Sequence, residues 1–431
     1  MSVQETKLKA IADAIRAKDG TTEPIPANDF AGRILALETG GSLPDNACTI
    51  SLTAEPPEGG TVSGGGVAQE GMTLTINAEP DEDNNYYFDG WKENDAVVSA
   101  EPVYTFPVTA DRALIAAFLQ SQYTPGVDWW ESTLPSSANW RSVTYGAGKF
   151  VAVATSNTNK AAYSTDGITW AAATLPKSES WSNVVFGNGK FVAVASSSSN
   201  AAAYSTDGIN WTAAILPSTQ YWNGLTFGDG KFVAVANGAQ GAYSTDGINW
   251  IKMTPPSSGN WSSITYGGGK FVAVSATSSS SSNSSKIAAY SADGINWTQT
   301  ALPESRRWCS VVYGDGVFVA VAGSTGSYST TSDKAAYSSD GITWTETPLP
   351  AVMRWYSVTY GGKKFVALAG GTAQVESSDM IAYSEDGITW TATTLPSSAK
   401  WHSVAYGNGR FVAVAQNGDK AAYSSAKGPG A

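Results

Sequence analysis

One pattern of apolar and polar positions recurs seven times along the last three-quarters of the chain. Each copy approximates W-x-S-V-T-Y-G-x-G-K-F-V-A-V-A, followed by a polar connection and A-A-Y-S-x-D-G-I-T-W-T-x-x-x-L-P. A period of about 40–50 residues that holds only strands and turns predicts the blades of a β-propeller. The leading tryptophans of the copies are Trp140, Trp181, Trp222, Trp261, Trp308, Trp355 and Trp401.

Each copy is predicted to form four strands. In the first copy these strands cover residues 141–145, 149–154, 160–164 and 169–174. Glycine-containing turns join the first strand to the second and the third to the fourth. The second strand, F-V-A-V-A, is apolar at every position, which is typical of a strand buried on both faces between neighbouring blades.

The two ends of the repeat region complement each other. The seventh copy stops after Tyr423 without its fourth strand, and a matching segment, G-V-D-W-W-E-S-T-L-P at 126–135, precedes the first copy. We therefore predict an all-β seven-bladed β-propeller over 120–431, in which the N-terminal strand pairs beside Tyr423 and closes the last blade. Closure of this kind removes free sheet edges.

Six copies carry the motif S-x-D-G-I-[TN]-W. An aspartate followed by glycine favours a tight turn, in which the carboxylate accepts hydrogen bonds from backbone amides. The six aspartates are Asp166, Asp207, Asp246, Asp293, Asp340 and Asp386. The motif resembles the Asp-box of sialidase-type propellers, and the resemblance implies a structural role for these residues. A carboxylate repeated in every blade does not form the unique constellation that catalysis needs.

The catalytic residues of the sialidase-like family are not found in this chain. The Arg-Ile-Pro motif of that family is absent, and the propeller region holds few arginines. The resemblance therefore concerns the fold, which does not imply the activity. We predict no catalytic residues, and nothing in the sequence indicates a metal or a cofactor.

The topology predicts one uniform and one variable face of the propeller. Connections between strands one and two and between strands three and four lie on the first face, and they are nearly identical among the copies. The second face carries the connections between strands two and three, which range from 416–419 to the longer 275–286 and 323–334, and the segments before each leading tryptophan. Variable polar side chains on a rigid frame are typical of a recognition surface.

Positive charge gathers beside the tryptophans of copies five, six, seven and one, which are consecutive around the ring. Guanidinium groups beside aromatic rings suit an anionic or polyhydroxylated ligand. The leading tryptophans can stack on such a ligand or pack between blades, and the sequence leaves both possibilities open. The candidate ligand-binding residues are Trp308, Trp355, Trp401, Trp140, Arg306, Arg307, Arg354, Tyr356, Lys400, His402 and Arg141.

The N-terminal quarter is predicted to hold two further parts. Residues 46–119, with G-G-T-V-S-G-G-G, E-G-M-T-L-T-I-N-A-E-P and Y-Y-F-D-G-W-K-E-N-D, resemble the internalin-type B-repeat, a small β-grasp-like module of surface and tail proteins. Its Trp91 and Phe88 are predicted to be core residues. Residues 1–45 show helical periodicity in two short segments, which we expect to dock onto a partner.

The segment L-K-A-I-A-D-A-I-R-A-K-D-G also resembles the N-terminal part of tail proteins of phages that infect Gram-positive bacteria. Together the resemblances imply a receptor-binding tail or tail-fibre protein, made in the host cytoplasm and acting in the virion tail. They imply a bacterial surface glycan or cell-wall polymer as ligand, tail or baseplate proteins as partners of the N-terminal helices, and a homotrimer by analogy with tail fibres.

Charge, hydropathy and cysteine content limit the classes of partner and cross-link that we expect. The net charge of −11 provides no overall attraction for nucleic acid. No stretch reaches the about 18 apolar residues of a membrane helix, and the first residues lack an apolar core of the length that a signal peptide needs. The two cysteines, Cys48 and Cys309, fall in different predicted domains, so we expect no disulfide between them.

Two other functions stay open on the sequence. The first is a propeller glycoside hydrolase or lyase, which needs paired carboxylates about 5–10 Å apart on the variable face. The few candidates are Glu179, Glu304, Asp333, Glu376 and Asp379. The second is a bacterial surface adhesin or scaffold without a viral origin.

Overall fold

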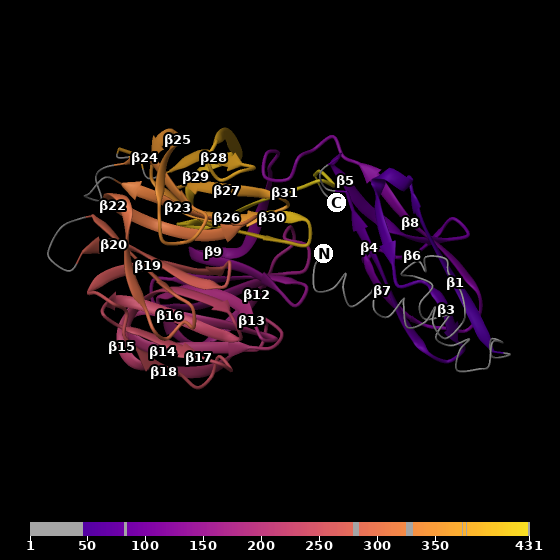
Figure 1. The fold of residues 1–431 in the computed structure, drawn as a ribbon, viewed down its shortest axis with the longest axis horizontal. Helices are drawn as coiled ribbons and strands as arrows, with labels where there is room; N and C mark the ends of the chain where they lie inside the picture. The colour runs from indigo at the N-terminus through magenta and orange to yellow at the C-terminus, as the bar shows by residue number, and fades with distance from the viewer. Residues whose placement is uncertain are drawn as a thin grey trace, which may run out of the picture. The chain divides into compact units, whose positions relative to one another are not determined.

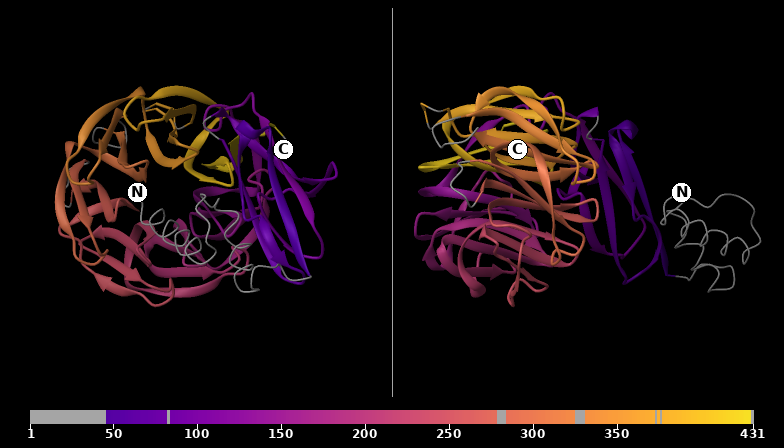
Figure 2. Two further views of the ribbon diagram at one scale, coloured as in Figure 1. Left: turned by 45° about the vertical axis from the view of Figure 1, so that its right-hand side comes forward. Right: turned by 60° about the vertical axis from the view of Figure 1, so that its left-hand side comes forward.

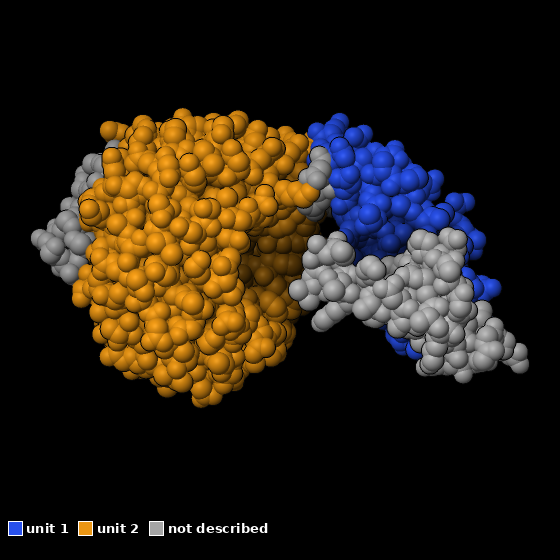
Figure 3. All heavy atoms as spheres, in the orientation of Figure 1, with its two compact units in different colours: residues 1–122 blue, residues 123–431 orange. Residues whose placement is uncertain are grey.

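The computed structural model describes residues 46–429 except 82–83, 279–283, 325–330, 373 and 376. The predicted helical segment at 1–45 lies outside the described residues. The chain divides into two compact units, 1–122 and 123–431 (Figure 3). In the part that is described, no helix has the length and apolar character needed to cross a membrane.

The first unit consists of two sheets that share one core (Figure 1). The five-stranded sheet has the order β3(Gly66–Gln69), β1(Ala47–Glu55), β8(Arg112–Gln120), β5(Tyr86–Glu93), β6(Ala96–Ser99). The three-stranded sheet has the order β2(Gly60–Ser63), β4(Thr73–Pro80), β7(Val103–Pro107), and the short 3-10 helix η2(Pro57–Gly59) precedes β2. Trp91 is fully buried and donates its indole N–H to the Pro102 carbonyl at 3.0 Å, so its predicted core role, like that of buried Phe88, is confirmed.

The second unit consists of seven four-stranded antiparallel blades around a common centre (Figure 2), as the repeats predicted. The chain passes from the outer strand of one blade to the inner strand of the next. At four of these passages the two strands form one continuous strand of 17 residues. Blades one to three comprise β9(Trp130–Gly146), β10(Lys149–Thr155), β11(Thr158–Ser164), β12(Ala171–Glu179), β13(Trp181–Gly187), β14(Lys190–Ser205), β15(Thr212–Gly228), β16(Lys231–Gly238), β17(Gly241–Ser244) and β18(Ile251–Met253).

Blades four to seven follow the same plan. They comprise β19(Gly259–Gly267), β20(Lys270–Ser278), β21(Ser285–Ser291), β22(Thr298–Gly314), β23(Val317–Ser324), β24(Ser332–Ser338), β25(Thr345–Met353), β26(Trp355–Gly361), β27(Lys364–Ala369), β28(Ser378–Ser384), β29(Thr391–Gly407), β30(Arg410–Gln416) and β31(Gly418–Ser425). The first half of β9 is the outer strand of the seventh blade, and its second half is the inner strand of the first.

The second strand of each blade is buried on both faces, as its composition predicted. In β10, Phe150 and Ala152 pack in one apolar cluster with Val412 of the preceding blade. The alternate residues Val151 and Val153 pack in a different cluster with the next blade. Side chains of a strand point to opposite faces in alternation, so this one strand serves two blade interfaces.

The seventh blade is assembled from both ends of the unit. Tyr423 of β31 pairs with Trp130 of β9 in an antiparallel register, as predicted. In the seventh blade the third and fourth strands come from opposite ends of the unit, so no peptide segment joins them. A hydrogen bond connects them instead: the Gly126 N–H donates to Ser424 Oγ at 2.7 Å. Within the first blade, the Gly167 N–H donates to Ser164 Oγ at the same distance.

A cyclic series of close contacts joins the blades. A Cβ added at Gly146 would lie 2.0 Å from Cγ of Phe186 in the next blade, and the same contact recurs six more times. The last member of the series is Gly407, where an added Cβ would lie 2.0 Å from Cγ of Tyr145 in the first blade. Only glycine leaves room for the neighbouring aromatic ring at these positions.

We predict that Gly407→Ala destabilises the propeller by about 1–3 kcal/mol, because the added methyl group overpacks the interface between the seventh and first blades. Gly418→Ala is the control: its Cβ would meet only the backbone nitrogen of Lys420 at 3.9 Å. We expect the control to stay within about 0.5 kcal/mol of the parent chain. Thermal unfolding followed by near-ultraviolet circular dichroism compares the two, and equal midpoints would contradict the contact.

Candidate functional site

A β-bulge interrupts the inner strand of every blade directly after the leading tryptophan. The residue after each tryptophan has no partner in the register with the second strand. Bulges bend a strand and turn the direction of the extra side chain. The bulge residues are Arg141, Ser182, Asn223, Ser262, Cys309, Tyr356 and His402.

An axial cavity of about 500 Å³ collects these side chains from six of the seven blades. It also contains residues that precede the leading tryptophans, and residues at the ends of the second strands such as Asn237 and Gln416. Connections between strands two and three therefore share one cavity with the segments before the tryptophans, as the topology predicted. Six predicted ligand residues line the cavity: Arg141, Arg307, Arg354, Tyr356, Lys400 and His402.

The charge of the axial cavity is opposite to that of the chain. Arg141, Arg307, Arg354 and Lys400 bring four cationic groups to it, and none of the described residues that line it is acidic. The whole chain has a net charge of −11. A concave site lined by one sign of charge raises the local concentration of counter-charged ligands.

Three side chains of the axial cavity interact directly with one another, and this group, Arg141, His402 and Tyr356, is called the stack below. Arg141 Nη1 lies 2.6 Å from His402 Nε2, and His402 Nδ1 lies 2.9 Å from the Arg141 carbonyl oxygen. These partners assign the imidazole proton to Nδ1, with Nε2 accepting from the guanidinium. The ring of Tyr356 stacks on His402 with centroids 5.2 Å apart and 17° between the planes.

Burial dominates the titration of this stack. It lowers the pKa of His402 well below its usual value, and the Arg141 and Lys400 charges lower that pKa further. Burial also raises the pKa of Tyr356. His402 is therefore neutral at physiological pH and acts as a hydrogen-bond acceptor that orients Arg141.

Glycine makes room for Tyr356 in this stack. A Cβ added at Gly370, which directly follows β27, would lie 2.4 Å from the Tyr356 ring. The equivalent position in the fifth blade is Gly323, where an added Cβ would lie 2.7 Å from Cys309 Sγ. Neither glycine was recognised from the sequence as part of the site, because the contact exists only after the bulge turns the facing side chain.

The four tryptophans among the predicted ligand residues are corrected by the structure. Trp140, Trp308, Trp355 and Trp401 have no exposed surface. Their indole N–H groups donate to backbone carbonyls four residues earlier, for example from Trp308 to Glu304 at 3.2 Å. A ring without exposed surface cannot stack on a ligand, so these residues pack between blades.

Arg306 is the other predicted ligand residue that the structure places elsewhere. Its guanidinium lies 2.6 Å from Glu304 and 3.8 Å from Glu346, outside the axial cavity. Arg307 lines the cavity. Adjacent residues in an extended strand point to opposite faces, which the sequence pattern could have indicated.

The six repeated aspartates stabilise turns. Asp340 Oδ1 accepts hydrogen bonds from the backbone N–H groups of Ile342 and Thr343, each at 2.8 Å. These bonds lower the pKa of Asp340 to about 2. Equivalent bonds form at Asp166, Asp207, Asp246, Asp293 and Asp386.

None of the described carboxylates considered for a hydrolase or lyase lines the axial cavity. Glu179 lies 2.5 Å from Lys177 and accepts a hydrogen bond from Ser197 at 2.8 Å. Glu304 pairs with Arg306, and Asp333 lies 3.9 Å from Lys334. Glu376 lies outside the described residues.

Amide side chains are the part of the site that sequence reasoning missed. Asn223 donates from Nδ2 to Asn237 Oδ1 at 2.7 Å and accepts from Ser196 Oγ at 2.7 Å. Asn260 and Gln416 line the same cavity. Their positions beside a leading tryptophan or at the end of F-V-A-V-A were visible in the sequence. Cys309 also lines the cavity, and Cys48 and Cys309 are both free thiols, as expected.

Comparisons with known proteins bear on each unit separately. Residues 50–122 match the family described as the Divergent InlB B-repeat domain, as the motifs of this region implied. The comparison with curated proteins found no match.

Several solved structures are similar to the propeller unit. A streptogramin B lyase structure has a TM-score of 0.57 and 15% identity, over 68% of this chain and 97% of that one. A virginiamycin B lyase from Staphylococcus aureus has a TM-score of 0.58 and 14% identity, over 69% and 99%. YCF48 bound to D1 peptide has a TM-score of 0.53 and 16% identity, over 70% and 96%. At these identities the likeness shows the propeller fold alone.

We predict that the folded chain keeps His402 neutral at pH values well below the ordinary pKa of histidine. In the unfolded chain this imidazole is protonated at a higher pH, so the stability of the fold decreases as pH falls below about 6.5. The chain has one histidine, so a single imidazole signal reports the titration by nuclear magnetic resonance. That signal should not titrate between about pH 7 and about pH 5.5.

His402→Asn is the matched variant, because its amide can still donate to the Arg141 carbonyl. The stability difference between parent chain and variant should move in favour of the variant as pH falls, toward the slope expected for one proton. A pH-independent difference, or a histidine signal that titrates near its ordinary pKa, would contradict the buried stack.

Proposed function

We propose that this chain is a non-catalytic receptor-binding protein whose propeller recognises an anionic glycan or cell-wall polymer of a bacterial surface. The observation that carries the proposal is the axial cavity, where four cationic groups meet and no described lining residue is acidic. In a chain with a net charge of −11, this cavity is where an anion is attracted.

The chemistry of the axial cavity suits an anion with hydroxyl groups. Arg141, Arg307 and Arg354 offer planar forks that match carboxylate and phosphate oxygens. The side chains of Asn223 and Asn237 also line the cavity, and amide groups can donate hydrogen bonds to sugar hydroxyls and accept them. The ligand class follows from this combination of fixed charge and amides.

The placement in a phage tail is also part of the proposal. It is supported by the resemblance of residues 1–45 to phage tail proteins and by the B-repeat match at 50–122. The N-terminal segment would attach the chain to tail or baseplate proteins, and the propeller would bind the host surface. By analogy with tail fibres, the chain would form a homotrimer. The alternative is a bacterial surface adhesin without a viral origin. Identifying the neighbouring genes would distinguish the two, and tail or baseplate genes there would favour the first assignment.

An enzymatic function is the other alternative, since lyases occur among the similar structures. In the virginiamycin B lyase with quinupristin, a histidine-to-alanine variant is described as catalytically inactive. Here both nitrogens of the single histidine, His402, are engaged by Arg141. A neutral imidazole with both nitrogens engaged is poorly placed to move a substrate proton. This argument favours binding over catalysis.

A glycan array probed with the full chain tests the proposal. We expect discrete anionic ligands to be bound without release of shortened products. Arg307→Ala and Arg354→Ala should each weaken binding about 10–100-fold, because each removes a charged hydrogen-bond donor. Arg306→Ala is the matched control: it removes the same side chain one residue away, outside the axial cavity, and should bind as the parent chain does.

Three results would count against the proposal. Binding that is unchanged in Arg307→Ala and Arg354→Ala would remove the axial cavity as the site. A loss of binding in Arg306→Ala equal to that in Arg307→Ala would indicate a general charge effect. Shortened glycans after incubation would establish the enzyme instead.

A further inference from the structure

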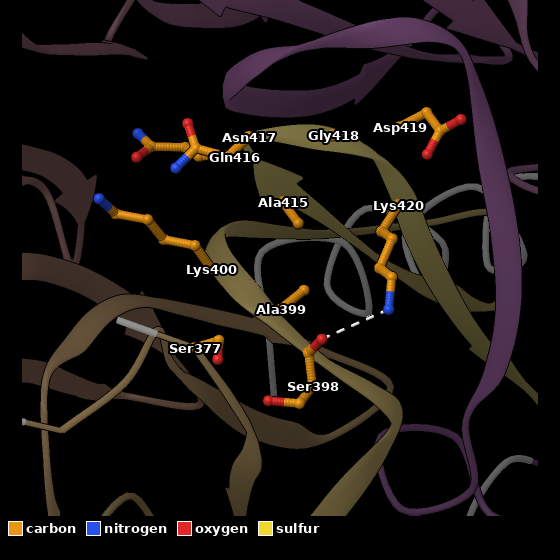
Figure 4. Close-up of a pocket in the computed structure, with 10 residues that line it drawn as sticks. All are labelled: Ser377, Ser398, Ala399, Lys400, Ala415, Gln416, Asn417, Gly418, Asp419 and Lys420. Atoms are coloured by element: carbon orange, nitrogen blue, oxygen red, sulfur yellow. Dashed lines mark hydrogen bonds between the residues drawn. The ribbon is translucent and has the colours of Figure 1, made fainter. Parts of the chain in front are cut away.

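A second cavity of about 420 Å³, the side cavity, lies against the seventh blade (Figure 4). Its walls include Asn417, Ser398 and Lys420, together with Lys400 and Gln416. The last two also line the axial cavity. Lys400 of β29 and Gln416 of β30 are partners in the antiparallel register, so one cross-strand pair forms a wall common to both cavities.

The connection between the second and third strands is short beside the side cavity. In the seventh blade, β30 ends at Gln416 and β31 begins at Gly418, so Asn417 alone separates them. Asn417 takes a left-handed conformation with φ of 60°, and its N–H donates to Asn139 Oδ1 at 3.0 Å. Because this turn is tight, the connection does not fill the side cavity, which Ala415 and Ala399 also line.

The side cavity contains side chains of both charges. Lys420 Nζ donates to Ser397 Oγ at 3.0 Å and to the Ser398 carbonyl at 3.3 Å, which holds the ammonium group at the rim. Figure 4 shows Lys400 on the other side of the cavity, near Gln416 and Asn417. A carboxylate, Asp419, also belongs to this cavity, whereas the axial cavity has none among its described residues. The two sites therefore suit different parts of a ligand.

We infer that the ligand is a repeating polymer, with an anionic group of one unit in the axial cavity and a neighbouring unit in the side cavity. This inference rests on the proposed function and deepens it. Each cavity alone is near the lower end of the about 300–1,000 Å³ typical of small-molecule sites. Two adjacent sites bind linked units at a high effective concentration, so a longer ligand gains affinity without new contacts elsewhere.

The propeller offers a matched pair of lysines for the test. Lys160 in the first blade occupies the same place in the repeat as Lys420, before A-A-Y-S. Its Nζ donates to the Ser137 carbonyl at 2.8 Å, much as Lys420 does to Ser398. Lys160 lines neither cavity. Replacing either lysine removes the same kind of side chain, which is half-buried at Lys160 and exposed at Lys420, and only Lys420 lines the side cavity.

We predict that the full chain binds a synthetic glycerol-phosphate dimer at least about tenfold more tightly than glycerol phosphate itself, measured by isothermal titration calorimetry. Lys420→Ala should remove most of that gain and leave the binding of glycerol phosphate unchanged. Lys160→Ala should leave both affinities unchanged, and Lys420→Arg should retain part of the gain. Arg307→Ala should weaken the binding of both ligands.

The outcomes separate the two proposals. Equal affinity of the parent chain for glycerol phosphate and its dimer overturns the polymer inference and leaves the axial site standing. A dimer advantage that persists in Lys420→Ala also overturns it, because a merely statistical benefit of a longer ligand does not depend on the side cavity. Binding of neither ligand, together with no anionic ligand on the array, overturns the proposed function itself.

Discussion

The propeller depends on one constraint: no blade can bury both of its faces alone. The second strand is apolar at every position, and its alternate side chains enter two different cores, as Phe150 and Val151 do. Each core is completed by the neighbouring blade, and the series of glycine–aromatic contacts returns from Gly407 to Tyr145 in the first blade. The free energy of burial therefore favours a closed circle over any open stack of the same repeats.

This constraint also explains why recognition chemistry gathers near the axis. The packed faces of the blades tolerate little variation, because one added methyl group is felt in a close-packed core. The bulge residue on each inner strand is not packed between blades in this way, so its identity can vary. Blades that are nearly identical in their cores thus present a serine, an asparagine, a tyrosine, a histidine or an arginine at one equivalent place, for example Ser262, Tyr356 and Arg141.

The positive charge of the axial cavity comes from side chains of the inner strands, which meet near the axis. Arg141 is held by a neutral histidine whose other nitrogen bonds to the Arg141 backbone, so the guanidinium is oriented before any ligand arrives. A preorganised donor loses less entropy on binding than a mobile one. The nearby carboxylate of Glu304 pairs with Arg306 outside the cavity.

The sequence by itself determined the number of blades, their strands and the completion of the seventh blade by residues near Trp130, because these follow from periodicity and local turn chemistry. The B-repeat unit was indicated by the resemblance of its motifs to a known family. The sequence also placed Arg307, Arg354 and Lys400 near one another. Only the tertiary structure decided that the leading tryptophans are buried and which of Arg306 and Arg307 faces the axial cavity. Those outcomes depend on the bulge and on what the neighbouring blade covers, and neither is encoded in local spacing.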